Sequence, residues 1–271
     1  MTDLFEGPIW LIGCGNMAGA MLEGWLRAGA DPRQFTVVRP SGRPVAGGVR
    51  VLTAFPEDEV PALVLLGVKP QKLDEVAPAL ASVLDPATIF VSILAGVELA
   101  ALRGRFPAVR NVAKAMPNLP VALGKGVVEL CTDADGAAAR GVVERLMAAL
   151  GETIWFDDES LFNVASALTA AAPAFLFRFL DALAAAAAEL GLPPDQAARL
   201  AARMAEGAAA LAATSDATPQ ELARRVASPG GTTEAGLNVL DAEDGLRPLI
   251  LRTLAASRRR GEEMAAAARG G

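Results

Sequence analysis

Gly13, Gly15 and Ala18 form the pattern Gly-x-Gly-x-x-Ala, the first spacing in the chain that could carry chemistry. The pattern lies directly between an apolar, strand-like run and a helix-like run. There the first glycine allows a tight turn, the second lets the backbone approach a pyrophosphate, and the small third residue lets the helix pack closely. The N–H groups of Asn16 and Met17 at the helix start would face the phosphates, assisted by the helix dipole. We therefore expect a dinucleotide-binding turn, with a ligand-free glycine turn as the alternative.

Arg39, Ser41 and Arg43 follow the second strand-like run, where NAD-specific domains normally carry an acidic residue that binds the ribose hydroxyls. A carboxylate there would repel a 2′-phosphate, whereas arginines can pair with it and a serine can donate a hydrogen bond to it. The sequence therefore favours NADPH as the cofactor, with NADH as the second candidate. The alternative is that the arginines only solvate a surface loop.

A second set of polar groups surrounds a later pair of glycines. Ser228 precedes Gly230 and Gly231, and Thr232 and Thr233 follow them in the first turn of a helix-like run. Hydroxyls and free N–H groups therefore converge on one spot, which suits an anion and an amine. A Gly-Gly helix entry with a capping hydroxyl is the alternative.

The residue types that are missing restrict the chemistry. The chain has no histidine and no tyrosine, which excludes a Ser-His-Asp triad, a His-ligated metal and Tyr-dependent reductases. Cys14 and Cys131 are far apart, so no metal site and no disulfide framework is expected. The net charge of −6 argues against nucleic acid as a partner. Proton transfers must use carboxylates, hydroxyls, lysine, backbone or water.

Short apolar runs alternate with helix-like stretches in the first half of the chain. The runs are 8–13, 35–39, 62–68, 88–94 and 109–113, with further extended pieces at 126–131 and 152–156. This alternation is typical of βαβ units, whereas the sequence from 160 onward is Ala/Leu-rich with helical periodicity. We predict an α/β fold with an N-terminal, doubly wound Rossmann sheet at 1–157 and an all-helical domain at 158–271.

The tract 161–190 is the most apolar of the chain. Arg178 and Asp181 lie inside it and Pro173 interrupts it, so we expect a helix of a soluble protein rather than a membrane span. Its small apolar side chains require cover by neighbouring helices or by another subunit. The N-terminus lacks the pattern of a secretion signal, and we expect a cytoplasmic protein with no membrane partner.

Five segments stand in the order and spacing of one family. They are Gly13–Ala18, Val68–Gln71, Ser92–Val97, Ala115–Pro120 and Ala227–Thr233. Through them the chain resembles the pyrroline-5-carboxylate reductases over most of its length. The last segment is the most distinctive, whereas the first alone would indicate only a superfamily.

Two of these segments also have a physical interpretation. Val68, Lys69 and Pro70 follow one strand-like run, and Ala95 and Gly96 follow the next. Both therefore come to the carboxyl edge of the sheet, where open α/β folds bind ligands, and the small residues suit a flat nicotinamide ring. For each, an ordinary strand-end turn is the alternative.

The resemblance implies hydride transfer from NADPH to the C=N carbon of 1-pyrroline-5-carboxylate, which gives L-proline. It implies that Ser228 and the N–H groups of 230–232 hold the substrate carboxylate. Thr233 would be the catalytic residue and would hydrogen-bond the ring nitrogen, while Met116 and Asn118 would also contact substrate. It further implies a homodimer, or an oligomer of dimers, formed by the helical domain.

One segment departs from the family pattern. Thr169-Ala170-Ala171-Ala172-Pro173-Ala174 replaces the usual Ser-Gly-Ser-Gly-Pro-Ala, and Lys114 and Leu119 replace an Arg and a Thr. A smaller, less polar pocket leaves two alternatives open, a related cyclic imine or ketimine reductase and a non-catalytic dinucleotide-binding homologue. A β-hydroxyacid dehydrogenase is disfavoured, because it needs a lysine in the second domain and none follows Lys125.

Overall fold

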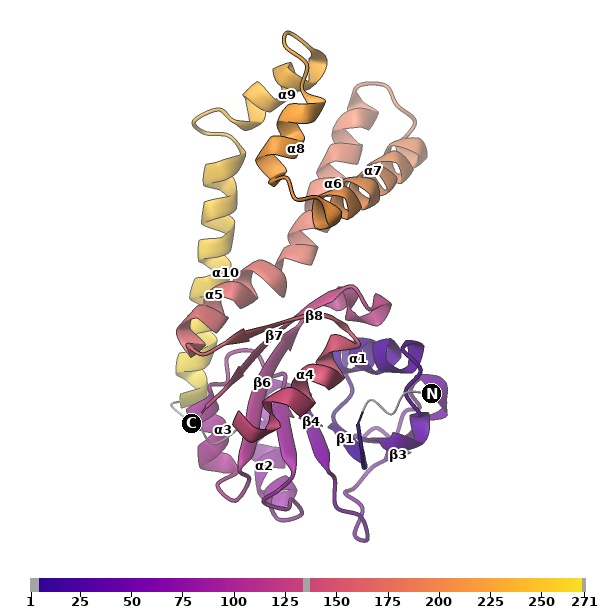
Figure 1. Cartoon of the computed structure of the whole chain (residues 1–271), viewed down its shortest axis with the longest axis vertical. Helices are drawn as coiled ribbons and strands as arrows, with labels where there is room; N and C mark the ends of the chain where they lie inside the picture. Colours follow the sequence, from indigo (N-terminus) through magenta and orange to yellow (C-terminus); the bar gives the residue numbers. More distant parts are fainter. Residues whose placement is uncertain (1–4, 134–136, 270–271) are drawn as a thin grey trace. The chain divides into compact units, whose positions relative to one another are not determined.

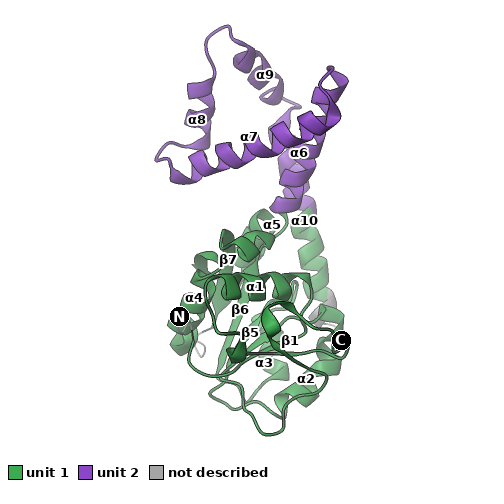
Figure 2. Ribbon diagram, turned by 90° about the vertical axis from the view of Figure 1, so that its right-hand side faces the viewer, with its two compact units in different colours: residues 1–171, 257–271 green, residues 172–256 purple. Residues whose placement is uncertain are grey.

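The computed structural model describes residues 5–133 and 137–269. They form two compact units, one made of 1–171 with 257–271 and the other of 172–256 (Figure 2). The first contains the whole sheet, and the second is helical.

Eight strands form one sheet in the order β3-β2-β1-β4-β5-β6-β7-β8 (Figure 1). Their bounds are β1 Ile9–Ile12, β2 Phe35–Val38, β3 Arg50–Leu52, β4 Leu63–Leu66, β5 Ile89–Ser92, β6 Asn111–Pro117, β7 Gly126–Thr132 and β8 Gly151–Phe156. β1, β2 and β4 are buried along their whole length, as strands between two layers of helices should be. All pairs are parallel except β6–β7, which is antiparallel because the short connection 118–125 holds no crossover helix.

Helices cover both faces of the sheet. On one face lie α1 (Asn16–Arg27) and α4 (Arg140–Ala148), which contribute Trp25 and Leu146 to the core. On the other lie α2 (Leu73–Ala81), α3 (Leu99–Arg105) and α5 (Glu159–Thr169), which contribute Leu80, Leu102 and Phe162. The predicted doubly wound Rossmann sheet followed by helices is therefore confirmed.

The sequence prediction differs from the structure at one strand. Strand β3 was not expected, because it has three residues, begins with a charged Arg50 and pairs only with β2 at the sheet edge. The two compact units divide at 171/172, one helix after the expected domain boundary at 157/158, since α5 packs on β7 and β8. The domain boundary at 157/158 stays a prediction.

The helical unit contains α6 (Ala172–Glu189), α7 (Pro194–Thr214), α8 (Pro219–Val226), α9 (Thr232–Leu240) and the first part of α10 (Leu246–Arg269). Thr218 caps α8 through a capping box with Glu221, and Asp195 lies in the first turn of α7. None of the side chains of α6 is buried in the single chain, although Phe177 and Leu176 are large and apolar. Within the described residues, the helical stretch 159–189 is long and apolar enough to cross a membrane.

Candidate active site

The glycine-rich turn lies where the order of the strands reverses. β1 is flanked by β2 on one side and by β4 on the other, so the ends of β1 and β4 border a topological switch point. The Gly13 N–H donates to Val38 O at 2.9 Å, and the Gly67 N–H donates to Ile12 O at 2.9 Å. The first bond joins the turn after β1 to the end of β2, and the second joins the turn after β4 to the end of β1, both at the carboxyl edge of the sheet.

Two glycines and an alanine allow these turns to pack together. Gly13 has φ of +80°, and a Cβ on it would lie 3.0 Å from Gly67 O. A Cβ on Gly67 would in turn lie 3.1 Å from the Ala18 Cβ. The close packing expected of Ala18 is therefore present, and its partner is the turn after the neighbouring strand β4.

Gly15 differs from Gly13 because the space beside it is open. Its φ of −84° suits any residue, yet a Cβ there would meet no atom within 4 Å among the described residues. The first helical bond of α1 runs from the Gly19 N–H to Gly15 O, so the N–H groups of Asn16, Met17 and Ala18 have no helical acceptor. Such a helix start binds anions.

A pocket of about 360 Å³ opens at this helix start. Its lining residues are Gly15, Asn16, Met17, Ala18, Gly67, Val68, Lys69 and Ile93. The structure thus brings two predicted groups, 15–18 and 68–69, to one cavity. Sequence reasoning missed Gly67 and Ile93, although a glycine directly after a buried strand was the signal for the first.

The three predicted 2′-phosphate residues lie on the turn after β2. The Arg39 guanidinium donates from Nε to Ser41 Oγ at 2.9 Å and from Nη1 to Cys14 O at 3.2 Å. Arg39 therefore joins this turn to the glycine-rich turn, and two of its five N–H donors are engaged. Arg43 is exposed beside Ser41. Burial raises the pKa of the Cys14 thiol, and the charge of Arg39 partly opposes this rise.

Gly96, in the turn after β5, has a structural role in addition to the ligand contact that the sequence predicts. Ala95 is exposed, whereas Gly96 has φ of +73° and a Cβ on it would lie 2.8 Å from the Cβ of Met264 in α10. Gly96 is thus required by a turn and by the approach of the last helix. Its contact with a nicotinamide stays a prediction.

The predicted substrate residues at the end of β6 differ in their surroundings. Met116 is half-buried, whereas the buried Asn118 uses its amide inside the protein. Asn118 Nδ2 donates to Thr169 O at 3.2 Å, and Asn118 Oδ1 accepts from the Val127 N–H at 2.9 Å. Asn118 therefore fixes the end of α5 and the start of β7.

The later glycine pair, in the helical unit, forms a tight turn before α9. Gly230 has φ of +70°, and the Gly231 N–H donates to Ser228 O at 2.9 Å. α9 begins at Thr232, so Thr233 lies in its first turn as predicted. The Gly230 N–H donates to the Glu234 carboxylate at 2.7 Å, an internal anion that the sequence reasoning missed.

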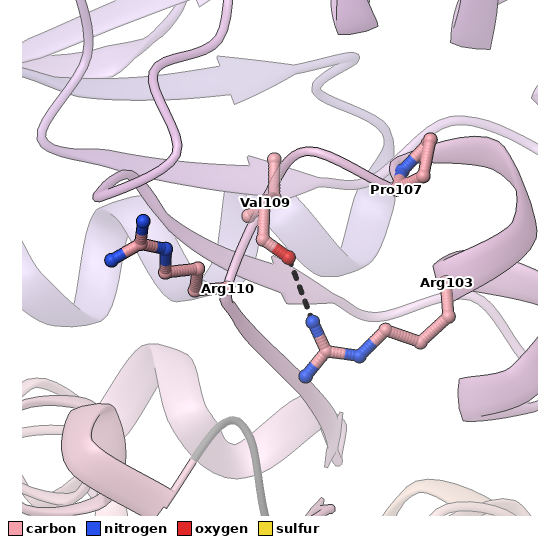
Figure 3. Close-up of a pocket in the computed structure, with 4 residues that line it drawn as sticks. All are labelled: Arg103, Pro107, Val109 and Arg110. Atoms are coloured by element: carbon pink, nitrogen blue, oxygen red, sulfur yellow. Dashed lines mark hydrogen bonds between the residues drawn. The ribbon is translucent and has the colours of Figure 1, made fainter.

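Another pocket, of about 400 Å³, lies at the opposite edge of the sheet (Figure 3). It is lined by Arg103, Pro107, Val109 and Arg110, directly before β6 begins. Arg103 is engaged there, since it donates to Val109 O at 2.7 Å and to both oxygens of Asp133. In a parallel α/β sheet ligands bind at the carboxyl edge, so this pocket is not the dinucleotide site.

Comparison with known proteins agrees with this geometry. The family model for NADP oxidoreductases, coenzyme F420-dependent, matches residues 8–96, and that for pyrroline-5-carboxylate reductase dimerisation matches 159–264. The chain is 35% identical to a pyrroline-5-carboxylate reductase of Pseudomonas aeruginosa over 95% of this chain and 96% of that one. It is 31% identical to that of Haemophilus influenzae over 87% and 89%. The structure of the Coxiella burnetii pyrroline-5-carboxylate reductase has a TM-score of 0.85 and 28% identity, over 96% of this chain and 99% of that one.

The Rossmann sheet, the pocket at its switch point and the match over 8–96 define an NAD(P)H-dependent oxidoreductase. The match over the helical half of the chain identifies the family within this class of oxidoreductases. The chain belongs to the pyrroline-5-carboxylate reductase family. The resemblance expected from the five sequence segments is confirmed.

Proposed function

We propose that the chain reduces the C=N bond of 1-pyrroline-5-carboxylate to give L-proline, with NADPH as the hydride donor. The observation that carries the proposal is the pocket of about 360 Å³ at the start of α1, in a chain that matches the family along both units.

The residues of the pocket fit a dinucleotide. The missing Cβ of Gly15 leaves room for a pyrophosphate against the free N–H groups of Asn16 and Met17. Arg39, Ser41 and Arg43 would hold a 2′-phosphate, which is why NADPH is preferred to NADH. When bound, the cofactor supplies the hydride.

The nicotinamide end of the cofactor would lie along the carboxyl edge of the sheet. Val68, Lys69 and Pro70 follow β4, and Ala95 and Gly96 follow β5. Lys69 and Ala95 are exposed at this edge, and Val68 and Lys69 line the pocket. These turns would place the ring in a fixed orientation, which is the main contribution that a protein makes to hydride transfer.

The turn before α9 suits the substrate. Since Glu234 already occupies the Gly230 N–H, the Ser228 hydroxyl and the N–H groups at Thr232 and Thr233 are the donors for a substrate carboxylate. The Thr233 hydroxyl would hydrogen-bond the ring nitrogen. The nitrogen arrives protonated as an iminium, or takes its proton from water or Thr233, because the chain has no histidine or tyrosine.

We infer that the protein is a cytoplasmic homodimer, or a larger oligomer of dimers. The exposed apolar side chains of α6 and the match to the dimerisation model support a second copy as the cover of this helix. For the same reason we assign the stretch 159–189 to assembly rather than to a membrane. A net charge of −6 makes nucleic acid an unsuitable partner.

A second candidate function is the reduction of another cyclic imine. The observation that favours it is the run Ala170-Ala171-Ala172 where α5 ends and α6 begins, which removes a hydroxyl that the family usually has. Loss of one polar contact changes the preference between related substrates by about tenfold or more.

The test is the purified protein with NADPH and 1-pyrroline-5-carboxylate, in which NADPH oxidation and L-proline formation are both measured. We expect equal amounts of the two. A panel of five- and six-membered cyclic imines, with and without a carboxylate, tests the second candidate. NADPH binding without turnover on any of them would contradict both.

A further inference from the structure

A buried carboxyl group that has no cationic partner among the described residues lies beside the predicted substrate residues. Glu129, in β7, is 0% exposed. Its two oxygens contact only hydroxyls among the described residues, with Ser166 Oγ at 2.7 Å from Oε2 and Thr169 Oγ1 next to Oε1. Burying a carboxylate without a cation is costly, and a group in this position usually keeps its proton.

The single hydrogen atom of the Ser166 hydroxyl also indicates that Glu129 is protonated. Its Oγ lies 2.7 Å from Glu129 Oε2 and 2.8 Å from Phe162 O, yet a hydroxyl has a single hydrogen. The carbonyl can only accept, so both contacts are hydrogen bonds when Glu129 donates to Ser166 and Ser166 donates to Phe162 O. Thr169 can then donate to the other carboxyl oxygen, which leaves each group satisfied.

The charged groups on the neighbouring strands are paired with other residues or exposed. On β6, Lys114 is 3% exposed and pairs at 2.6 Å with Glu159 of α5. On β7 itself, Cys131 stays a neutral thiol, because burial raises its pKa to about 11. On β8, Ile154 is the residue in register with Glu129, and Glu152 is exposed. Burial raises the pKa of Glu129, and the two hydroxyls only partly oppose this rise.

Glu129 also joins the parts of the chain that are predicted to contact substrate. It stands opposite Met116 in the β6–β7 register, so the two side chains share a face of the sheet. Thr169 is held twice, by Glu129 at its hydroxyl and by Asn118 Nδ2 at its carbonyl. Thr169 is the last residue of α5 and the first of the segment 169–174 that departs from the family pattern.

We propose that Glu129 is a positioning residue that, as a neutral carboxylic acid, holds Thr169 at the end of α5 in place near Met116 and Asn118. The side of the proposed substrate site formed by these three residues then has its proper shape only while Glu129 keeps its proton. This inference rests on the proposed function for its effect on turnover, but the protonation state of Glu129 does not depend on it.

The sign of the pH effect follows from linkage. Above the ordinary carboxyl value of 4.5 the unfolded chain releases the proton of Glu129, whereas the folded chain keeps it. Stability is therefore lost as the pH rises from that value toward the higher pKa of the folded state. Glu129→Gln keeps a donor and an acceptor but has no proton to lose, so it lacks this dependence.

The experiment compares the full-length protein with Glu129→Gln and Glu129→Ala, and uses Glu152→Gln as the control because that carboxylate is exposed on β8. Tm is measured at about pH 4.5 and about pH 8. We expect Glu129→Gln to match the unmodified protein at the lower pH and to exceed its Tm at the higher one, while Glu152→Gln follows the unmodified protein at both. Equal Tm differences at both pH values would overturn the neutral acid, whatever the enzyme reduces.

Steady-state kinetics tests the positioning role. With saturating NADPH, we expect Glu129→Ala to raise the KM for 1-pyrroline-5-carboxylate by about two- to tenfold, with the KM for NADPH unchanged and activity restored in Glu129→Gln. The ratio of kcat/KM between Glu129→Gln and the unmodified protein should rise with pH. A Glu129→Gln variant as impaired as Glu129→Ala, or parallel pH profiles, would overturn the proposal. If Glu129→Ala does not fold, Thr169→Val, which removes one hydroxyl at constant size, takes its place.

Discussion

Replacing Gly15 by alanine tests the cofactor site directly, because the fold and the ligand make opposite demands on this position. Gly15 has φ of −84°, and a Cβ there meets no atom within 4 Å among the described residues. We expect the free energy of unfolding to change by less than about 1 kcal/mol, since the lost N-cap preference and the reduced freedom of the unfolded chain offset each other. The added methyl group occupies space in the pocket instead.

The loss of NADPH affinity can be estimated from the bonds that the methyl group would break. A phosphate oxygen displaced from the N–H of Asn16 or Met17 loses a charge-assisted hydrogen bond worth about 1.5–3 kcal/mol. One such loss raises Kd by about 10- to 150-fold. Titration of the NADPH fluorescence measures Kd, and thermal unfolding without NADPH measures stability. A Gly15→Ala variant that binds NADPH as tightly as the unmodified protein would refute the placement of the pyrophosphate.

Gly13→Ala is the matched control, because we expect it to lower the stability of the fold rather than to block the cofactor pocket. Its φ of +80° and the 3.0 Å approach to Gly67 O leave no room for a Cβ. The left-handed conformation costs about 1–2 kcal/mol, and overpacking costs about 1–3 kcal/mol more. We expect Tm to fall by about 4–20 °C even without cofactor. Equal stability of the two variants would contradict the distinction between a packing glycine and a binding glycine.

Three further substitutions test the other assignments. Arg39→Asp should shift the preference from NADPH toward NADH by at least about tenfold in kcat/KM, and an unchanged ratio would mean that the 2′-phosphate is recognised elsewhere. Thr233→Ala should lower kcat/KM for the imine by about 10- to 150-fold with NADPH affinity retained. Thr233→Ser should restore this kcat/KM, and an equal loss of cofactor affinity in Thr233→Ala would contradict a role at the substrate. Phe177→Glu should convert dimers to monomers in light scattering, because a charge would replace an apolar side chain that is 58% exposed in the single chain; an unaltered mass would place the interface on another helix.

Much of the fold follows from local patterns. β1 and β4 are buried along their whole length, and such strands appear in the sequence as uninterrupted apolar runs. The fingerprint at 13–18 was predictable because each of its small residues answers a separate requirement of the turn. The capping box at Thr218 also has a local signal, since Glu221 follows Thr218 by three positions.

The remaining features depend on contacts between distant segments. Glu129 gave no signal in the sequence, because its burial depends on Ser166 and Thr169, which follow it by 37 and 40 positions. Gly96 was interpreted as a ligand contact or as part of a strand-end turn, and its approach to Met264 escaped prediction because the last helix sets it. The antiparallel orientation of β7 also escaped prediction, although its signal is the short connection 118–125, which holds no crossover helix.

The contact between Gly96 and α10 affects how the protein should be handled. Met264 and Ala265 rest on the turn after β5, and Ala265 is buried there. We therefore expect an affinity tag fused behind this helix to disturb a segment that packs on the edge of the sheet where the coenzyme is expected. Purification handles belong at the other end of the polypeptide, and shortening the chain before Met264 removes a support of that edge.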